Sequence, residues 1–552
     1  MDYEKLAELL FPHVTLTPED LELRYPPRQL KEGARVTRFA PSPTGYLHVG
    51  GLFGALTDVM VAKISGGVSY LRIEDTDKKR EIDDGVSAII QGFDAFGVRF
   101  DEGVTGFGTE RGDYGPYTQS QRVEIYHTVA KALVKKGLAY PCFCTAEELS
   151  QLREQQEKEG ALIRGYFGKY ARCRDLTMEQ IEENLKAGKS YVLRFRSDGS
   201  EDKRIVFEDL IRGKIEMPEN IIDEVLLKSD GIPTYHFAHI CDDHFMRTTH
   251  VIRAEEWLSS VPKHLAMFRA CGYKPPKYVH TAQVMKLDDE TGDKRKLSKR
   301  KDPEAAVSYF VEKGFPKESL IEYLLTLLNS NFEDWRRANP TADAMDFPFN
   351  LKKMGASGCL FDLAKLTDVS KNVISHMDAA TVYERISAWA KDYAPEFYAL
   401  FTRDPDYSTA ILNIDRDVPK PRKDLAKWEE APDYLSYFFD ETFVPENVLP
   451  EKISAADAKA ILDAYCGVYD EKMPKDEWFA CVKSICPGLG FCPEVKEYKK
   501  NPENWKGHVG DVSTVIRVAV TGRTNTPDLC TIMQRLGRDR VLSRLRSFRD
   551  SL

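Results

Sequence analysis

The stretch ARVTRFAPSPTGYLHVG, residues 34–50, constrains the fold more than any other part of the sequence. The short run Val36–Phe39 has apolar residues at both ends and predicts a strand. Two prolines and a glycine follow at once, which excludes a helix and predicts a loop. From there to Gly66 apolar residues recur at helical spacing. The sequence therefore predicts a strand, a loop and a helix, with His48 at the N-terminus of the helix.

A helix that begins with His48, Gly50 and Gly51 is suited to binding a phosphate group. The free backbone N–H groups and the helix dipole attract an anion, and glycine lets it approach closely. The spacing is neither the dinucleotide fingerprint GxGxxG nor the P-loop GxxxxGK[ST]. A basic stretch far downstream, KRKLSKRK at residues 294–301, is by itself most simply a solvated loop.

Together the two stretches resemble the HIGH and KMSKS elements of class I aminoacyl-tRNA synthetases. They are written here HVGG, from His48, and KLSKR, from Lys296. The surrounding words RFAPSPTG and RIEDTD resemble the bacterial-type glutamyl-tRNA synthetase family, and the resemblance runs from about residue 35 to the C-terminus. It implies a glutamate–tRNA ligase, which uses ATP to activate L-glutamate as glutamyl-adenylate and transfers it to the 3′ end of tRNA(Glu).

Alternating strands and helices, together with this resemblance, predict an α/β fold. We expect a class I Rossmann-like catalytic domain with a parallel sheet and an α+β insertion, followed by all-α anticodon-binding domains. Residues 235–241 and 250–253 are predicted to be strands of that sheet. The expected segments are an N-terminal extension (1–33), the first half of the catalytic domain (34–135), an acceptor-stem-binding insertion (136–234), the second half with the KLSKR loop (235–300), a stem-contact helical domain (301–370) and a helical anticodon-binding region (371–552).

Composition and charge argue against several classes of protein. The chain has 552 residues, 42% of them hydrophobic and 30% charged, and no apolar run long enough to cross a bilayer. The acidic, amphipathic N-terminus does not resemble a secretory signal, and eleven cysteines show no disulfide-framework spacing. A formal net charge of −9 argues against non-specific nucleic-acid binding but leaves room for a local basic face. We expect a cytoplasmic monomer with no membrane partner.

Adenylate formation asks side chains to position reactants and to stabilise charge on the α-phosphate. His48 at a helix N-terminus suits the phosphate oxygens, and Lys299 is predicted to neutralise the leaving pyrophosphate as a point charge. Mg²⁺ is expected to shield the triphosphate. The resemblance implies as ATP-binding residues His48, Gly50, Gly51, Glu256, Trp257, Val284, Met285, Lys296, Ser298 and Lys299.

Glutamate carries two carboxylates and one ammonium, so a selective site needs fixed cations and an anion. Arg38 suits a carboxylate and Glu74 suits the ammonium. The resemblance implies as glutamate-binding residues Arg38, Ala40, Ser42, Glu74, Tyr235, His239 and Arg253. His239 stands where the bacterial family often has asparagine, so its protonation is expected to affect glutamate affinity.

The insertion contains a candidate site for structural Zn²⁺, which some members of the family carry in this region. Its candidate ligands are Cys142, Cys144, Tyr170 and Cys173. Two cysteines one residue apart on a strand present two thiolates, and a third leaves the fourth ligand open. Three free thiols are the alternative interpretation. The string CDDH at residues 241–244 is interpreted as strand-end carboxylates that orient the site rather than as a metal site.

Several alternatives remain open. Within the resemblance these are glutaminyl-tRNA synthetase, a non-discriminating glutamyl enzyme that also charges tRNA(Gln), and the shorter relative that glutamylates a modified tRNA base. The last lacks an anticodon region, for which residues 371–552 provide enough chain. The others are a small, single-domain nucleotidyltransferase and an RNA-binding module without catalysis, which would not need His48, Lys299, Arg38 and Glu74 all intact.

Overall fold

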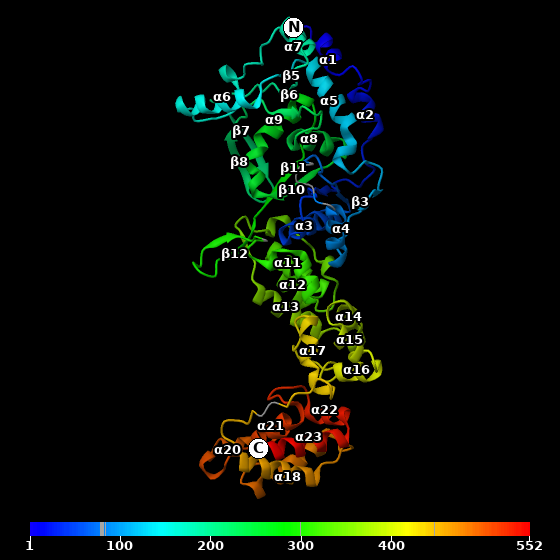
Figure 1. Ribbon diagram of the computed structural model, residues 1–552, viewed down its shortest axis with the longest axis vertical. Coiled ribbons are helices and arrows are strands. Elements are labelled where there is room, and N and C mark those ends of the chain that lie inside the picture. Colours follow the sequence, from blue (N-terminus) through cyan, green and yellow to red (C-terminus); the bar gives the residue numbers. More distant parts are fainter. Residues whose placement is uncertain (78–81, 83, 299, 446–447) are drawn as a thin grey trace. The chain divides into compact units, whose positions relative to one another are not determined.

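The computed structural model describes residues 1–77, 82, 84–298, 300–445 and 448–552. These residues divide into two compact units. The first unit comprises Met1–Phe310 with Ile321–Asp362, and the second comprises Val311–Leu320 with Leu363–Leu552. The described strands all lie in the first unit, whereas the second is helical (Figure 1). Lys299, which is predicted to be catalytic, lies outside the described residues.

Parallel strands form the centre of the first unit. They are β1 (Val36–Phe39), β2 (Val68–Leu71) and β3 (Glu102–Gly106) in one sheet, and β10 (His250–Ala254) and β11 (Lys277–Thr281) in another. The two sheets meet where Val36 N donates to Thr249 Oγ1 at 2.8 Å and Thr249 N donates to Val36 O at 3.0 Å. The spatial order is therefore β3-β2-β1-β10-β11. From β1 the strand order runs toward β3 on one side of the sheet, and from β10 it runs toward β11 on the other side. In a sheet of this kind the ligand crevice is expected at the carboxyl ends of the two strands where the order reverses, which are β1 and β10.

The predicted strand, loop and helix are confirmed. Helix α3 (Val49–Ser65) follows β1 and packs against β1, β2 and β10. His48 caps it, since its Nδ1 atom accepts from Gly50 N at 2.9 Å. The helix ends at Gly66, whose left-handed backbone (φ 64°) is tolerated by glycine. The helix N-terminus is thereby held beside the end of β1.

Helices and small sheets complete the first unit. The helices are α4 (Gly85–Ala95), α5 (Val123–Lys135), α6 (Ala146–Lys158), α7 (Met178–Lys186), α8 (Tyr235–Phe245), α9 (Val261–Cys271), α11 (Lys317–Leu328) and α12 (Phe332–Ala338); α10 (Val307–Lys313) runs into the second unit, to which the start of α11 also belongs. The insertion contains the antiparallel sheet β5 (Ala139–Cys142), β6 (Val192–Phe195) and β9 (Val225–Leu227). The other strands are β4 (Thr109–Arg111), β7 (Arg204–Asp209), β8 (Gly213–Pro218), β12 (Val284–Leu287), β13 (Lys294–Lys296) and β14 (Cys359–Leu360).

The prediction of a strand over residues 235–241 was wrong, because these residues begin helix α8. Phe237, Ile240 and Cys241 are fully buried at the i, i+3, i+4 spacing of one helix face. A short apolar run of this kind fits a buried strand equally well. The carboxylates of Asp242 and Asp243 are consequently presented by a helix and not by a strand end.

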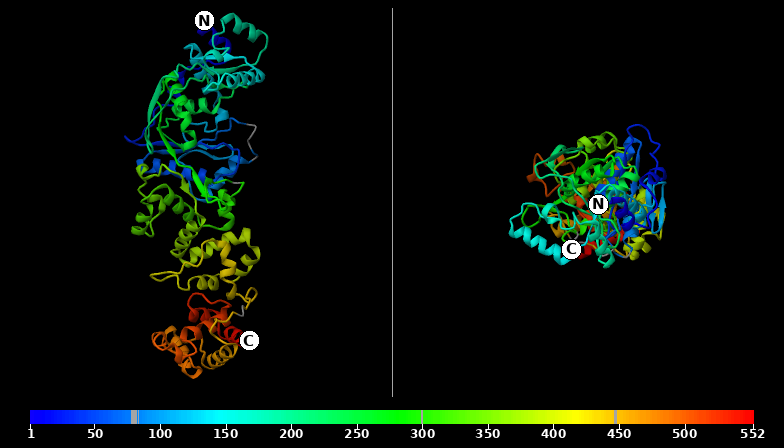
Figure 2. Two further views of the ribbon diagram at one scale, coloured as in Figure 1. Left: turned by 90° about the vertical axis from the view of Figure 1, so that its left-hand side faces the viewer. Right: turned by 90° about the horizontal axis from the view of Figure 1, so that it is seen from above.

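The N-terminal extension contains two helices. These are α1 (Tyr3–Leu10) and α2 (Pro18–Arg24), the second of which begins with a capping box formed by Thr17 and Asp20. Helix α1 packs on α5 and lies beside the insertion, since Lys5 Nζ is 2.6 Å from a Glu182 carboxylate oxygen (Figure 2). Arg28 forms a bidentate ion pair with Glu102 at 2.7 and 2.9 Å. The extension is therefore part of the first unit.

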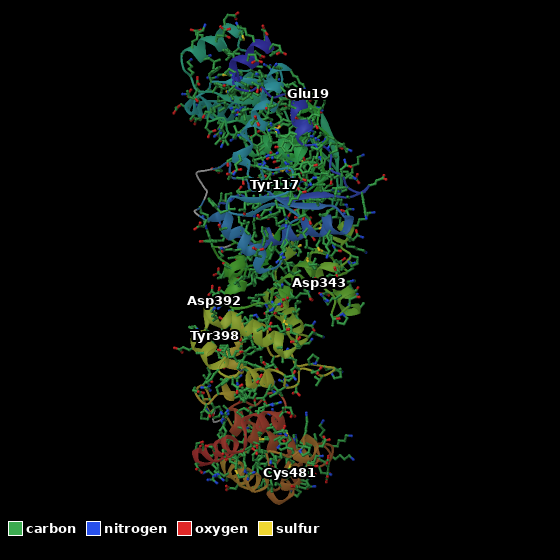
Figure 3. All side chains as sticks on the ribbon, turned by 90° about the vertical axis from the view of Figure 1, so that its right-hand side faces the viewer. Glu19, Tyr117, Asp343, Asp392, Tyr398 and Cys481 are labelled. Atoms are coloured by element: carbon green, nitrogen blue, oxygen red, sulfur yellow. The ribbon has the colours of Figure 1, made fainter. Side chains whose placement is uncertain are left out.

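The second unit packs short helices around one apolar core. They are α13 (Leu363–Ser375), α14 (Ala379–Tyr393), α15 (Pro395–Phe401), α16 (Pro405–Leu412), α17 (Ala431–Tyr434), α18 (Ala455–Val468), α19 (Lys475–Ile485), α20 (Val495–Tyr498), α21 (Val509–Thr521), α22 (Leu529–Leu536) and α23 (Arg538–Ser551). Cys481, which is labelled in Figure 3, lies on α19 and forms no disulfide among the described residues. No helix in the described part of the chain combines the length and apolar character that a bilayer crossing requires.

Candidate active site

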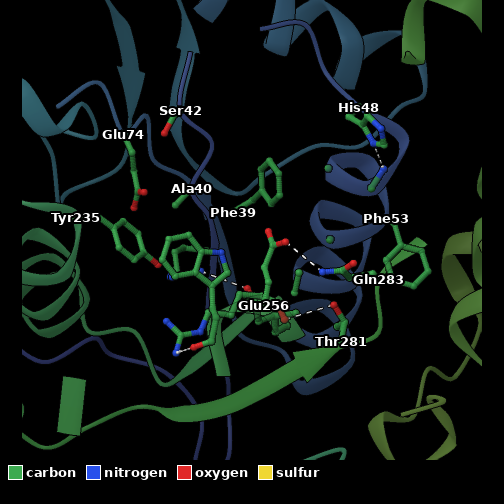
Figure 4. A pocket seen from close by; sticks show the side chains of 18 of the residues that line it. Phe39, Ala40, Ser42, His48, Phe53, Glu74, Tyr235, Glu256, Thr281 and Gln283 are labelled. Carbon is green, nitrogen blue, oxygen red and sulfur yellow. Dashed lines mark hydrogen bonds between the residues drawn. The ribbon is translucent and has the colours of Figure 1, made fainter. Parts of the chain in front are cut away.

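A cavity of about 1030 Å³ opens where β1 and β10 end. Figure 4 shows Glu74, Ser42 and Tyr235 at one end of it, and His48 with the start of α3 at the other. Most of the residues predicted for ATP and glutamate line this cavity. They are Arg38, Ala40, Ser42, His48, Gly50, Gly51, Glu74, Tyr235, Arg253, Glu256, Trp257, Val284 and Lys296. His239, Met285 and Ser298 are not among the lining residues.

The helix end of the cavity suits an anion. His48 Nδ1 accepts a hydrogen bond from Gly50 N, so a neutral ring carries its proton on Nε2 and is a donor there. A side chain at Gly51 would come within 3.1 Å of Leu47 Cδ1, so glycine keeps this turn compact. The first turn of α3 adds backbone N–H groups and the positive end of the helix dipole.

A buried network of charges holds the other end. Asp243 on α8 is fully buried and lies 3.2 Å from Arg38 Nε, 2.7 Å from an Arg72 nitrogen and 2.7 Å from His239 Nδ1. Burial alone would raise the pKa of Asp243, but Arg38 and Arg72 hold it well below its usual range. The carboxylate is therefore ionised and fixes the Arg38 guanidinium at the cavity wall.

Glu74 and Arg253 place opposite charges at this end of the cavity. Glu74 follows β2 and accepts from Arg72 at 3.1 Å; burial raises its pKa above the usual range despite that partner. Arg253 is contributed by β10 and lies over the Tyr278 ring, 4.8 Å from its centroid. The site thus offers two guanidinium groups and one carboxyl to a bound molecule.

His239 lies behind the cavity. It is fully buried, stacks on Tyr235 with ring centroids 6.1 Å apart, and its Nε2 is 3.3 Å from the Tyr278 hydroxyl. Burial lowers its pKa to about 4, although the neighbouring Asp243 opposes that shift. The imidazole is therefore neutral at pH 7, and the Tyr235 ring on which it stacks lines the cavity in its place.

The protonation of His239 is expected to make stability depend on pH. Between pH 6.5 and 4 the unfolded chain binds a proton at this residue that the folded chain does not, so the free energy of unfolding falls as the pH falls. At pH 5 this residue alone contributes a loss of about 2 kcal/mol. We expect His239→Asn to lose correspondingly less stability than the wild type between pH 7 and pH 5 in urea unfolding. Equal losses would contradict the assignment.

Lys296, the first residue of KLSKR, is the last residue of β13, which pairs with β12 as an antiparallel hairpin. Arg295 is held by Asp302 at 2.6 and 2.7 Å, and Ser298 N donates to the same carboxylate at 2.9 Å. Lys296 Nζ lies 2.9 Å from Glu256 Oε2 at the cavity rim. Both side chains of that ion pair are about half exposed or more, so the pair stabilises the fold by only about 0–1 kcal/mol. Lys296 can therefore leave Glu256 and pair with another anion.

The three cysteines of the insertion come together. Their sulfur atoms lie within 4.8 Å of one another. Hydrogen bonds from Cys144 and Cys173 lower the pKa of the Cys142 thiol. The Tyr166 hydroxyl is 3.3 Å from Cys144 Sγ, whereas Tyr170 donates to Glu159 at 2.5 Å. This donor set fits a tetrahedral zinc ion, with Tyr166 nearest to the position of a fourth ligand.

Sequence reasoning missed the residues behind the site. Arg72, Asp209, His264 and His280 were not singled out, although all are buried and charged or polar. The signal that could have found part of this network is the spacing of His239 and Asp243, four residues apart, which on a helix brings two side chains to one face.

The chain is similar to known proteins over most of its length. The model for "tRNA synthetases class I (E and Q), catalytic domain" matches residues 35–338, and that for "Anticodon binding domain" matches residues 500–549. The glutamate–tRNA ligase of Clostridium perfringens (strain 13 / Type A) is 51% identical over 549 residues, covering 99% of this chain and 100% of the relative. That of Sorangium cellulosum (strain So ce56) is 44% identical, covering 96% and 97%.

A solved structure is similar over nearly the whole chain. It is a glutamate tRNA ligase from Elizabethkingia meningosepticum CCUG26117 in complex with its amino acid, with a TM-score of 0.76 and 26% identity, covering 94% of this chain and 100% of that one. Relatives of this similarity match both the catalytic part and the helical C-terminal part. The chain therefore belongs to the glutamate–tRNA ligase family of class I tRNA synthetases.

Proposed function

We propose that this chain activates L-glutamate with ATP and transfers it to the 3′ end of tRNA(Glu). The observation that carries this proposal is that one cavity combines an amino-acid end, with Arg38, Arg253 and Glu74, and a helix N-terminus marked by His48. Because residues of both ends line one cavity, the glutamate carboxylate would meet the α-phosphate of ATP inside it.

The amino-acid end is proposed to bind glutamate through charge. Arg38 and Arg253 bind its two carboxylates, while Glu74 holds the ammonium with Tyr235 as one wall. Glutamine carries one carboxylate fewer, so one of these two guanidinium groups would lose its substrate counter-ion. Ser42 and the backbone at Ala40 add hydrogen bonds from the loop that follows β1.

The nucleotide end is proposed to bind ATP with Mg²⁺. His48 Nε2 donates to the phosphates, Gly50 and Gly51 let them approach, and the stretch around Val284 flanks the base. Lys296 leaves Glu256 for a phosphate oxygen when ATP arrives. These groups stabilise the charge that grows on the α-phosphate and on the departing pyrophosphate. Lys299 is assigned the same task from the sequence alone.

The remaining segments are proposed to bind tRNA. We assign residues 136–234 to the acceptor stem and residues 371–552 to the anticodon, with residues 301–370 contacting the stem between them. A match to an anticodon binding domain at residues 500–549 supports the second assignment. We further propose that the chain acts as a monomer, which sedimentation velocity tests directly.

We propose that the cysteine cluster holds one structural zinc ion through Cys142, Cys144 and Cys173, with Tyr166 in preference to Tyr170 as the fourth ligand. We expect about one zinc per chain by elemental analysis. Cys173→Ser should release it and lower the melting temperature, while Cys481→Ser, on α19, should do neither. A wild-type protein purified without chelator that contains no zinc would contradict the proposal.

Pyrophosphate exchange tests the function. We expect exchange that requires glutamate, is not supported by glutamine, and appears only when tRNA is added. Exchange with glutamine would favour the glutaminyl enzyme. Charging of purified tRNA(Gln) with glutamate, besides tRNA(Glu), would identify a non-discriminating enzyme. No exchange by a folded protein that binds tRNA would favour a binding module.

A further inference from the structure

Arg253 and Arg38 are buried to a similar extent but have different partners. Arg38 is 4% exposed and its Nε lies 3.2 Å from the Asp243 carboxylate. Arg253 is 9% exposed, yet among the described residues no carboxylate lies within 4.0 Å of its guanidinium. A buried cation without a direct counter-ion is costly unless a ligand supplies one.

The hydrogen-bond partners of Arg253 are all neutral. Its Nε donates to His280 Nε2 at 3.0 Å, one terminal nitrogen lies 3.3 Å from His264 Nδ1, and the other donates to the Trp257 carbonyl at 3.3 Å. A guanidinium has five N–H groups. These contacts use three of them and leave one on each terminal nitrogen, and N–H groups on the two terminal nitrogens can bind one carboxylate through two hydrogen bonds.

His280 can accept from Arg253 only in one tautomer, and Asp209 selects it. His280 is fully buried, and its Nδ1 lies 2.7 Å from Asp209 Oδ2. Asp209 also accepts from the backbone N–H groups of Ile211 at 3.0 Å and Arg212 at 2.9 Å. Burial lowers the pKa of His280, so its ring is neutral. The single proton sits on Nδ1, toward Asp209, and the lone pair of Nε2 faces Arg253.

We propose that His280 and Asp209 are positioning residues for glutamate, which fix the Arg253 guanidinium so that its two remaining N–H groups bind one substrate carboxylate. The His280 ring lies between Asp209 and Arg253, so the negative charge of Asp209 acts on the guanidinium across the width of that ring. A carboxylate in direct contact would occupy the N–H groups that the substrate needs, whereas the neutral ring leaves them available. This inference rests on the function proposed above, in which Arg253 binds glutamate.

Two amide substitutions at one position test the proposal. The oxygen of glutamine reaches the place of His280 Nε2, so His280→Gln keeps an acceptor for Arg253. The shorter asparagine reaches only the place of Nδ1, so His280→Asn loses that acceptor while remaining polar. At His264 the accepting atom is Nδ1, so the order reverses: His264→Asn should preserve the contact and His264→Gln should lose it.

Exchange kinetics are measured first with the wild type, whose failure to use glutamate would overturn the proposed function itself. In an active wild-type background we expect His280→Asn to raise KM for glutamate about 10- to 100-fold, with KM for ATP within about twofold, and His280→Gln to stay within about threefold of wild type. Urea unfolding of each variant identifies any that do not fold. If a His280 variant does not fold, the KM values of His264→Asn and His264→Gln are compared instead. Equal effects of the two amides at both positions, or no effect of any, would overturn the inference.

Discussion

Replacing His48 with asparagine is expected to lower the rate of glutamate-dependent pyrophosphate exchange by roughly 10²- to 10³-fold, the usual cost of removing one donor to a developing charge. Asparagine is among the best N-cap residues, so its side-chain oxygen can accept from Gly50 N as His48 Nδ1 does. The substitution therefore removes the Nε2 donor and keeps the helix cap.

The matched variant is His48→Ala, which removes both the donor and the cap. It should lose activity to a similar extent and, in addition, about 1 kcal/mol of stability in urea unfolding. The loss should fall on kcat more than on KM for glutamate, because the ring acts on the phosphates. An asparagine variant with nearly full exchange activity would mean that the ring serves only as a cap.

Replacing Asp243 with asparagine is expected to cost about 3–5 kcal/mol of stability, the usual range when one partner of a buried ion pair is removed. The fully buried carboxylate neutralises both Arg38 and Arg72. Without its charge two guanidinium groups stay buried with less compensation, and the amide must turn a donor toward one of them.

The control is Asp198→Asn, which breaks an ion pair with Arg269 at 3.0 Å in which both side chains are more than half exposed. That change should cost less than about 1 kcal/mol. Both variants are compared with the wild type by urea unfolding at pH 7, with the transition of the first unit followed separately from that of the helical unit. Equal costs for the two substitutions would show that the Asp243 charge does not hold the network together.

The sequence predicted the residues that line the cavity better than the buried residues that hold them in place. His48, Gly50 and Gly51 are readable because prolines, glycines and a change of periodicity mark a loop and a helix start locally. Arg38, Glu74 and Arg253 follow from strand ends and from the resemblance. What lies behind them depends on which buried side chains meet across long sequence separations, and local patterns carry no such information.

Helix α8 shows the physical limit most clearly. Phe237, Ile240 and Cys241 fit a strand as well as a helix, so the sequence alone gave the wrong element there. The choice is made by tertiary packing, since α8 lies against α5 and α9. The pairing of strands β11 and β7 likewise brings His280 and Asp209 together, although these two residues are 71 positions apart in the sequence.

The pairing of β1 with β10 also affects how the chain matures during synthesis. Arg38 leaves the ribosome 205 residues before Asp243, its counter-ion. At about 5–20 residues per second, this interval lasts roughly 10 to 40 s. During that time the early strands have an unpaired edge at β1, and Arg38 and Arg72 have no Asp243 beside them. The nascent first half therefore keeps this open edge, which chaperones and proteases can reach, until both α8 and β10 have emerged.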